Sequence, residues 1–383
     1  MRVLRINLRL VVAFGVLAMA SPAHASPISA HAMVYTCCTA DALKERIFAE
    51  AEAGGADFIR VDIEMSGIFK AQGDDPDWTQ LDEVMRLARK HHLRVLGLLL
   101  APPAYISTCP TGPDPGHCAV ADTREFGRLA GEIAAHAQDT IRHWEILNEP
   151  DADWAFTGTP EQYAAMLSAA HDGIKGRVPD ARVVLGGISN PKDPAWLERM
   201  FATPGTDAIH KFDIANVHLR GPVAPVVNRY QQFRAWLGDR GFKGPLWITE
   251  LGYPADPAYQ VDPSFTGGDA GQAAYLTQSL VDLGEAGAKQ VFVTLRDSGE
   301  GAYASEGLVH MDEAPGGATT RRESFYAVRR LATDWDPLMA WHREQPKPGA
   351  RLYEAVAAFV VGRRAALLWH GARSRTQRAL AGS

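Results

Sequence analysis

Residues 144–150 read Trp-Glu-Ile-Leu-Asn-Glu-Pro, and about a hundred residues later 246–253 read Leu-Trp-Ile-Thr-Glu-Leu-Gly-Tyr. Each stretch is an apolar, strand-like run that reaches a carboxylate, Glu149 in the first and Glu250 in the second, and then breaks at a proline or a glycine. A glutamate at the end of a buried strand is costly to desolvate unless its site uses the charge. The two stretches therefore predict buried strands that deliver paired carboxyls to one site.

The rest of the chain alternates strand-like and helix-like segments, as a parallel sheet with crossover helices requires. Several strand candidates are nearly continuous runs of Val, Ile and Leu, which is typical of strands buried on both faces. Their ranges are 32–35, 58–63, 94–100, 142–147, 182–187, 213–218, 246–250 and 290–295. Thr159, Pro160 and Gln162 between them form a good helix start. Eight such units over roughly 300 residues predict an α/β fold, a (β/α)8 TIM barrel. A doubly wound open sheet is the competing arrangement.

The chain has 383 residues, 46% of them hydrophobic, and a formal net charge of −6. This is enough to bury one large core, and barrels of this length are often a single domain. The charge is mildly acidic and no Lys/Arg cluster stands out, so nucleic acid is not an expected partner. We expect a monomer.

The two ends of the chain differ from its middle. Residues 1–25 combine early arginines, an apolar run and a final Ala-His-Ala, which predicts a secretory signal peptide and a secreted or periplasmic protein. No later segment is long enough to span a bilayer. We expect the barrel to occupy 26–335 and a small β extension with a frayed tail to occupy 336–383, where 353–361 and 364–369 are typical of a hairpin.

Four cysteines fit an exported protein with one or two disulfides. Cys109 and Cys118 bracket a loop rich in proline and glycine, where a bond would contribute about 2–3 kcal/mol. His117 beside Cys118 offers a competing metal site, but it has too few ligands close by. Cys37 and Cys38 are adjacent, and the sequence leaves their redox state open.

The first stretch closely resembles the W-E-x-x-N-E-P signature of clan A glycoside hydrolases, and the second resembles the nucleophile strand of the same clan. Further segments with this resemblance cover most of the chain after residue 25: 58–62, 183–187, 216–218, and 292–297 with 307–308. Among these enzymes the strand-eight end and return loop resemble those of families 39 and 5, and the chain most resembles a family-39-like bacterial polysaccharide hydrolase. The resemblance implies a TIM barrel and a retaining hydrolase of β-glycosidic bonds in an oligo- or polysaccharide. It implies no cofactor and no metal.

Two carboxyls suit this reaction because one must be a protonated acid for the leaving oxygen and the other an ionised nucleophile for the anomeric carbon. Carried over to this sequence, the resemblance implies that Glu149 is the acid/base and Glu250 the nucleophile. It also implies five substrate-binding or supporting residues. Asn148 would bind the sugar 2-hydroxyl, Arg60 would keep the nucleophile ionised, His218 would line the cleft, and Tyr253 and Trp154 would offer aromatic surface to sugar rings.

Two departures from the family pattern concern the substrate more than the reaction. Leu219-Arg220 replaces the usual Pro-Tyr after the strand-six histidine, and strand eight lacks the common Trp. Arg296 and Asp297 in strand eight could be site residues or could pair with each other. Two other functions stay open. One is a transglycosylase on the same barrel, and the other is a non-catalytic carbohydrate-binding protein.

Overall fold

The computed structural model describes residues 26–344 apart from 113, 190, 192–193 and 266. The segments expected to be a signal peptide (1–25) and a β hairpin (353–369) lie outside these residues. No helix in the described part of the chain has the length and apolarity needed to cross a membrane.

Eight parallel strands form one sheet in the order β5-β4-β3-β2-β1-β8-β7-β6. The strands are β1 (Ile28–Tyr35), β2 (Phe58–Glu64), β3 (Arg94–Leu100), β4 (Ile141–Asn148), β5 (Arg182–Gly187), β6 (Ala215–Leu219), β7 (Leu246–Leu251) and β8 (Val291–Thr294). Single parallel bridges, Val184 to Ile214 and Ile188 to Val217, join the two edges and nearly close the sheet into a barrel. The predicted TIM barrel and all eight predicted strands are confirmed.

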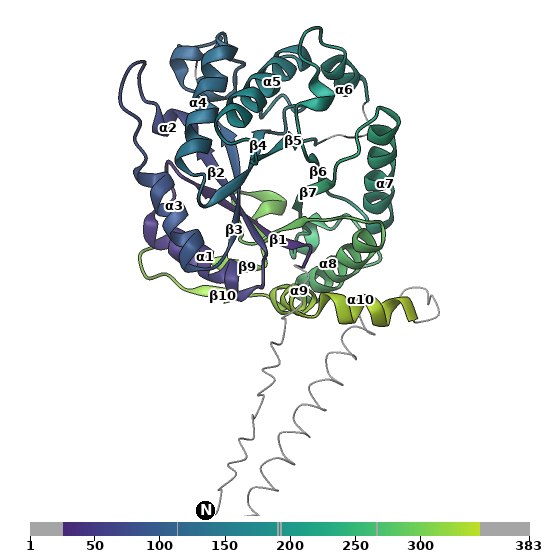
Figure 1. Cartoon of the computed structure of the whole chain (residues 1–383). Helices are drawn as coiled ribbons and strands as arrows, with labels where there is room; N and C mark the ends of the chain where they lie inside the picture. The colour runs from purple at the N-terminus through teal and green to yellow at the C-terminus, as the bar shows by residue number, and fades with distance from the viewer. Residues whose placement is uncertain (1–25, 113, 190, 192–193, 266, 345–383) are drawn as a thin grey trace, which may run out of the picture.

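A ring of helices surrounds the strands (Figure 1). The crossover helices are α1 (Asp41–Ala53), α3 (Thr79–Lys90), α4 (Thr123–His136), α5 (Pro160–Arg177), α6 (Pro194–Phe201), α7 (Val223–Asp239), α8 (Gly268–Glu285) and α9 (Glu323–Thr333). Their apolar faces and the outer faces of the strands make the main core. The predicted helix start is confirmed, because Thr159 and Gln162 form a complete capping box at α5.

Apart from short 3-10 helices, four further elements complete the described chain. Helix α2 (Met65–Ile68) follows β2, and the hairpin of β9 (Val309–Met311) and β10 (Thr319–Arg321) follows β8. Helix α10 (Trp335–Glu344) comes directly after α9, and its Leu338 and Met339 are buried in the main core. The first residues assigned to a separate C-terminal extension are therefore helical and pack on the barrel.

Candidate active site

The interior of the barrel is divided into an apolar end and a polar end. Alternate residues of a strand face the same side, so Phe58, Arg60 and Asp62 of β2 all point inward. Phe58 belongs to a small apolar cluster inside the barrel, near the amino ends of the strands. Arg60 and Asp62 line a cavity further along, where the carboxyl ends of the strands meet. This cavity has a volume of about 730 Å³.

A bulge in β7 turns Glu250 into the barrel. Trp247 and Thr249 are inward-facing, so a regular strand would point Glu250 outward. The register of β7 on β6 shifts between Val217 and His218, and a matching shift occurs on the β8 side. Two residues of β7 then face one residue of each neighbour, which re-aims the side chain that follows. Glu250 lines the cavity as a result and is only 7% exposed.

The end of β4 is bent by left-handed backbone at two residues. Leu147 has a φ of 59° and Glu149 a φ of 39°. Such conformations cost about 1–2 kcal/mol in a residue with a side chain, so the surrounding contacts must hold them. They allow Asn148 and Glu149, which are consecutive, both to line the cavity.

Arg60 lies at the centre of the buried polar groups and is 1% exposed. Its Nη1 donates to Glu250 Oε1 at 2.9 Å, and its Nη2 donates to Asn148 Oδ1 at 2.8 Å. Two further bonds of 2.8 Å, from Nε and Nη2, form a bidentate pair with Glu145. Arg60 thus ties β2 to β4 and β7, and its partners are not the neighbouring carboxylates Asp62 and Glu64 of its own strand.

Positive charge surrounds Glu250. Arg220 Nη2 donates to its Oε2 at 3.1 Å, on the oxygen that Arg60 does not use. Burial alone raises the pKa of Glu250, but His218, His31, Arg220 and Arg60 outweigh it and hold that pKa well below the usual range. Burial also lowers the pKa of His31 to about 3, so His31 is neutral near pH 7 and the two arginines are the permanent cations.

Glu149 is held by a chain of hydrogen bonds. His218 Nδ1 lies 2.7 Å from Glu149 Oε1, and His218 Nε2 lies 3.0 Å from the Thr249 hydroxyl. That hydroxyl donates to Asn216 Oδ1, which also accepts from the Thr249 N–H and is thereby fixed in orientation. His218 Nε2 must then donate to Thr249, which leaves Nδ1 of a neutral ring as an acceptor. Glu149 and His218 therefore share one hydrogen bond, whose direction depends on which of the two carries the proton. Gly187 is required beside them, since a Cβ there would overlap the His218 ring.

The two strand-end glutamates converge. One oxygen of Glu149, one oxygen of Glu250 and a ring nitrogen of His218 all lie within 4.8 Å of one another. This is the kind of donor group that could hold a cation. In this structure, however, Arg60 and Arg220 already occupy the two oxygens of Glu250. A second such group, Cys37 and Cys38 with Glu64, has its two sulfurs joined to each other as a disulfide.

Aromatic side chains form the open wall of the cavity. Trp154 is 65% exposed, Tyr303 is 43% exposed, and Tyr35 is partly exposed, while all three line the cavity. Exposed aromatic rings beside polar groups provide flat apolar surface, which a sugar ring can cover. Trp154 thus lines the cavity, and its contact with a sugar ring stays a prediction.

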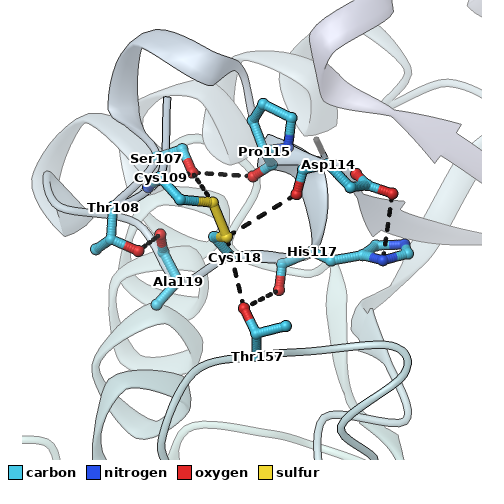
Figure 2. Close-up of a disulfide and its surroundings, with 9 residues drawn as sticks. All are labelled: Ser107, Thr108, Cys109, Asp114, Pro115, His117, Cys118, Ala119 and Thr157. Atoms are coloured by element: carbon cyan, nitrogen blue, oxygen red, sulfur yellow. Dashed lines mark hydrogen bonds and ion pairs between the residues drawn. A yellow bond between two sulfur atoms is a disulfide. The ribbon is translucent and has the colours of Figure 1, made fainter. Parts of the chain in front are cut away.

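The loop after β3 carries a disulfide, which Figure 2 shows with its surroundings. The sulfurs of Cys109 and Cys118 are joined, as predicted, with their Cα atoms 6.2 Å apart. His117, next to Cys118, pairs with Asp114 and lines the cavity. The main chain at His117 accepts a hydrogen bond from Thr157, which ties this loop to the segment after β4.

Asp62 lines the same cavity but has different surroundings. It is 5% exposed, and in the described part of the chain its carboxyl has no hydrogen-bond or ion-pair partner. Burial raises its pKa to about 7, since Glu64, Glu250 and Glu145 add to the effect and Arg60 only partly opposes it. At neutral pH this carboxyl is therefore a mixture of charged and uncharged forms.

Two of the residues predicted from the sequence do not line the cavity. Tyr253 is fully buried and stacks on Tyr275, and its hydroxyl donates to the Asp262 carbonyl. The Tyr253 ring packs in the apolar core of the barrel wall, so no ring surface is left for a sugar to contact. His218 lies behind Glu149 instead of on the cavity surface.

Arg296 and Asp297 do not pair with each other. Arg296 lines the cavity and pairs with Glu313, while Asp297 pairs with Arg322.

Other residues of the site were missed by the sequence interpretation. Glu145 lies in the motif itself, where its alternation with Leu147 and Glu149 could have indicated an inward position. Tyr303 carried no recognisable signal.

No protein-family model and no curated protein matches this sequence. Solved structures do share its fold. A family 39 glycoside hydrolase from Bacteroides cellulosilyticus WH2 is 15% identical with a TM-score of 0.59, over 80% of this chain and 64% of that one. A GH39 β-xylosidase from Caulobacter crescentus is 17% identical with a TM-score of 0.58, over 80% and 70%. A GH5_18 protein from Streptomyces cattleya, solved with GlcNAc, is 17% identical with a TM-score of 0.58, over 84% and 82%.

This chain thus spans just under two thirds of the length of the Bacteroides protein. At these identities the likeness concerns the course of the backbone. It agrees with the resemblance of the sequence motifs to families 39 and 5, and the chain has the (β/α)8 barrel fold found in glycoside hydrolases of both families.

Proposed function

We propose that this protein is a retaining glycoside hydrolase that cleaves β-linked oligo- or polysaccharides. The observation that carries the proposal is the approach of Glu149 and Glu250, whose nearest oxygens lie within 4.8 Å of each other beside one cavity. Retaining enzymes hold their two carboxyls about 5–5.5 Å apart, whereas inverting enzymes separate them by about 6.5–9.5 Å to admit a water. The short separation supports retention.

The two carboxyls have different partners, which supports different roles. Glu250 receives hydrogen bonds from two arginines, so it remains ionised and can act as the nucleophile. Glu149 is hydrogen-bonded to a histidine nitrogen, with which it can share a proton, as suits a group that must serve as acid and then as base. In the first step Glu250 attacks the anomeric carbon, the glycosidic bond breaks, and Glu149 gives its proton to the leaving oxygen. In the second step Glu149 takes a proton from water, which displaces Glu250 and releases the sugar.

Four further features support the rest of the proposal. Asn148 is held by Arg60 at the edge of the cavity, where its amide can bind a sugar hydroxyl. Trp154 and Tyr303 offer exposed rings for a second sugar unit. A β linkage agrees with the β-xylosidase among the similar structures. A disulfide between Cys109 and Cys118 and the signal-like N-terminus support export to the periplasm or the outside.

The test is turnover on a panel of aryl β-glycosides and β-linked oligosaccharides, with the products sized and the first-formed anomer identified by proton NMR. We expect at least one substrate to be cleaved with the β configuration kept. Release of the α anomer first would show inversion and would refute the proposed roles. If an added alcohol acceptor took most of the sugar in place of water, the protein would be a transglycosylase. Binding of oligosaccharides without turnover on any substrate would favour a carbohydrate-binding protein.

A further inference from the structure

Arg220 joins two buried carboxylates near the cavity. It follows β6 directly, and its Nη2 lies 3.1 Å from an oxygen of Glu250. The same guanidinium makes a bidentate pair with Glu306, through Nε to Oε1 and Nη2 to Oε2, both at 3.1 Å. Its flat face also lies 5.2 Å from the ring centre of Tyr303, a cavity residue. The sequence interpretation noted Arg220 only as an unusual cation.

Glu306 is itself firmly held. Its carboxyl is 2% exposed and accepts a hydrogen bond from Thr294 at the end of β8. The side-chain amide of Gln272 in α8 donates to main-chain oxygens around it, including those of Glu306 and Tyr253. Gly252 allows Glu306 to approach β7, because a Cβ at residue 252 would lie 2.1 Å from the Glu306 carboxyl carbon. The Glu306 carboxylate is therefore held in place, and it fixes the position of the Arg220 guanidinium.

From this geometry we infer that Arg220 is a positioning residue for Glu250 and that Glu306 fixes the position of Arg220. Arg60 holds one oxygen of Glu250, and Arg220 holds the other, so the carboxylate plane is fixed from two sides. The negative charge of Glu306 offsets most of the positive charge that Arg220 brings close to Glu250. This pairing orients the nucleophile without binding its negative charge as strongly as an unpaired arginine would. The inference rests on the proposed role of Glu250 as the nucleophile.

The pH dependence of Glu250 also involves its other neighbours. The charged or titratable groups that face it come from β1, β2, β4, β6 and the loops beyond β4, β6 and β8. They are His31, Tyr35, Arg60, Asp62, Glu145, Glu149, His218, Arg220, Tyr303 and, across Arg220, Glu306. All of these except Arg220 and Glu306 are unchanged in the variants below. A difference between the variants therefore reports on Arg220 and its partner.

The experiment compares the pH profile of kcat/KM in the parent, Arg220→Met and the double variant Arg220→Met/Glu306→Gln. The acid limb reports ionisation of the nucleophile in the free enzyme. In Arg220→Met the carboxylates of Glu250 and Glu306 lose the cation that lies between them, so we expect the acid limb to move up by about one pH unit or more. The double variant removes both charges. We expect its acid limb to return to within about half a unit of the parent, while kcat stays lower because Glu250 is no longer held on both sides.

Arg321→Met serves as the matched control, since Arg321 forms a similar pair with Glu50 far from the cavity. It should leave the pH profile unchanged. If Arg220→Met fails to fold, Arg220→Lys replaces it in the experiment. Lysine keeps the positive charge but cannot make the paired hydrogen bonds of a guanidinium. We expect a lower kcat and a smaller shift of the acid limb. An unshifted acid limb in folded Arg220→Met, or a double variant as shifted as the single one, would overturn the inference.

A second readout does not need turnover. Carbon-13 NMR of glutamate-labelled protein follows the Glu250 carboxyl directly, and Glu250→Gln assigns its signal. We expect the titration midpoint of that signal to rise in Arg220→Met and to recover in the double variant. A parent without activity on any glycoside would refute the proposed function and leave this result standing. An active parent with an unchanged Glu250 titration in Arg220→Met would refute the role of Arg220 alone.

Discussion

The β7 side and the β2 side of the cavity each carry a buried carboxyl, and the pKa values of these two carboxyls are shifted in opposite directions. Glu250 is 7% exposed and Asp62 is 5% exposed, and both line the same cavity. Glu250 has a pKa well below its usual range, whereas the pKa of Asp62 is raised to about 7. Burial raises the pKa of both groups, so it does not explain the difference. The partners do, because Arg60 and Arg220 donate to Glu250, whereas no arginine among the described residues donates to Asp62. Of the two, only Glu250 is kept permanently charged, as a nucleophile must be.

The strongest test of this comparison exchanges each carboxyl for its amide. Glu250→Gln should lower kcat by several orders of magnitude on every substrate, because an amide cannot form the glycosyl-enzyme bond. Asp62→Asn should retain far more activity. Steady-state kinetics on the best panel substrate, with melting temperatures to establish folding, measure both. If Asp62→Asn were the more damaging change, the assignment of the nucleophile from its cations would be wrong.

Glu149 extends the comparison to a carboxyl that faces a histidine. Glu149→Ala should lower kcat/KM by about 10²–10⁴-fold on substrates with alkyl leaving groups, which need a proton. The loss should be much smaller for a dinitrophenyl glycoside, because its leaving oxygen needs none. Equal losses on both kinds of substrate would contradict the role of Glu149 as the acid. Glu313→Ala, at the exposed rim of the cavity, is a suitable control of the same substitution.

Asp62 should also affect stability in a pH-dependent way. Its pKa is higher in the folded protein than in the unfolded chain, so between about pH 4 and 7 the folded state keeps a proton that the unfolded state has released. The folded state binds more protons in this range, and its stability therefore falls as the pH rises. Asp62→Asn is neutral at every pH. The melting temperature of Asp62→Asn relative to the parent should rise from pH 4 to pH 7 and then level off.

A control isolates this effect from the titration of other groups. Asp75 is exposed, and Asp75→Asn should show no such trend. Melting curves by circular dichroism at pH 4, 5, 6, 7 and 8 are sufficient. A constant difference between Asp62→Asn and the parent over this range would mean that the Asp62 carboxyl is already ionised at pH 4 in the folded protein.

The sequence predicted the fold well because the fold depends on local pattern. Eight apolar strands, their spacing and a capping box at Thr159 are all encoded by neighbouring residues. Glu149 and Glu250 could be predicted for the same reason, since each closes a recognisable strand. Arg60 was predicted to keep Glu250 ionised. The structure has a hydrogen bond of 2.9 Å between them, and the role itself stays a prediction.

The remaining parts of the site depend on contacts between distant segments. The bulge at Thr249 and the left-handed backbone at Leu147 decide which side chains face inward, and neither has a clear signal in the sequence. Tyr253 follows the same strand as Glu250, but it is past the bulge and turns into the core. The pairing of Arg220 with Glu306 spans 86 residues, so only the folded chain reveals it.

The smallest predicted effect concerns the wall of the cavity that carries no charge. Trp154 is 65% exposed, and we expect it to contribute through ring contact with a sugar unit and not through Glu250. Loss of one aromatic contact is worth about 0.5–1.5 kcal/mol, which corresponds to a KM about 2- to 12-fold higher in Trp154→Ala. kcat and the acid limb should stay near the parental values, because the partners of Glu250 are untouched. Trp154→Phe should recover part of the loss, and Tyr326→Ala, an exposed aromatic on α9, should have no effect. A shifted acid limb in Trp154→Ala would mean that Trp154 influences the ionisation of Glu250. The hydrogen-bond partners of Glu250 alone would then not explain that ionisation.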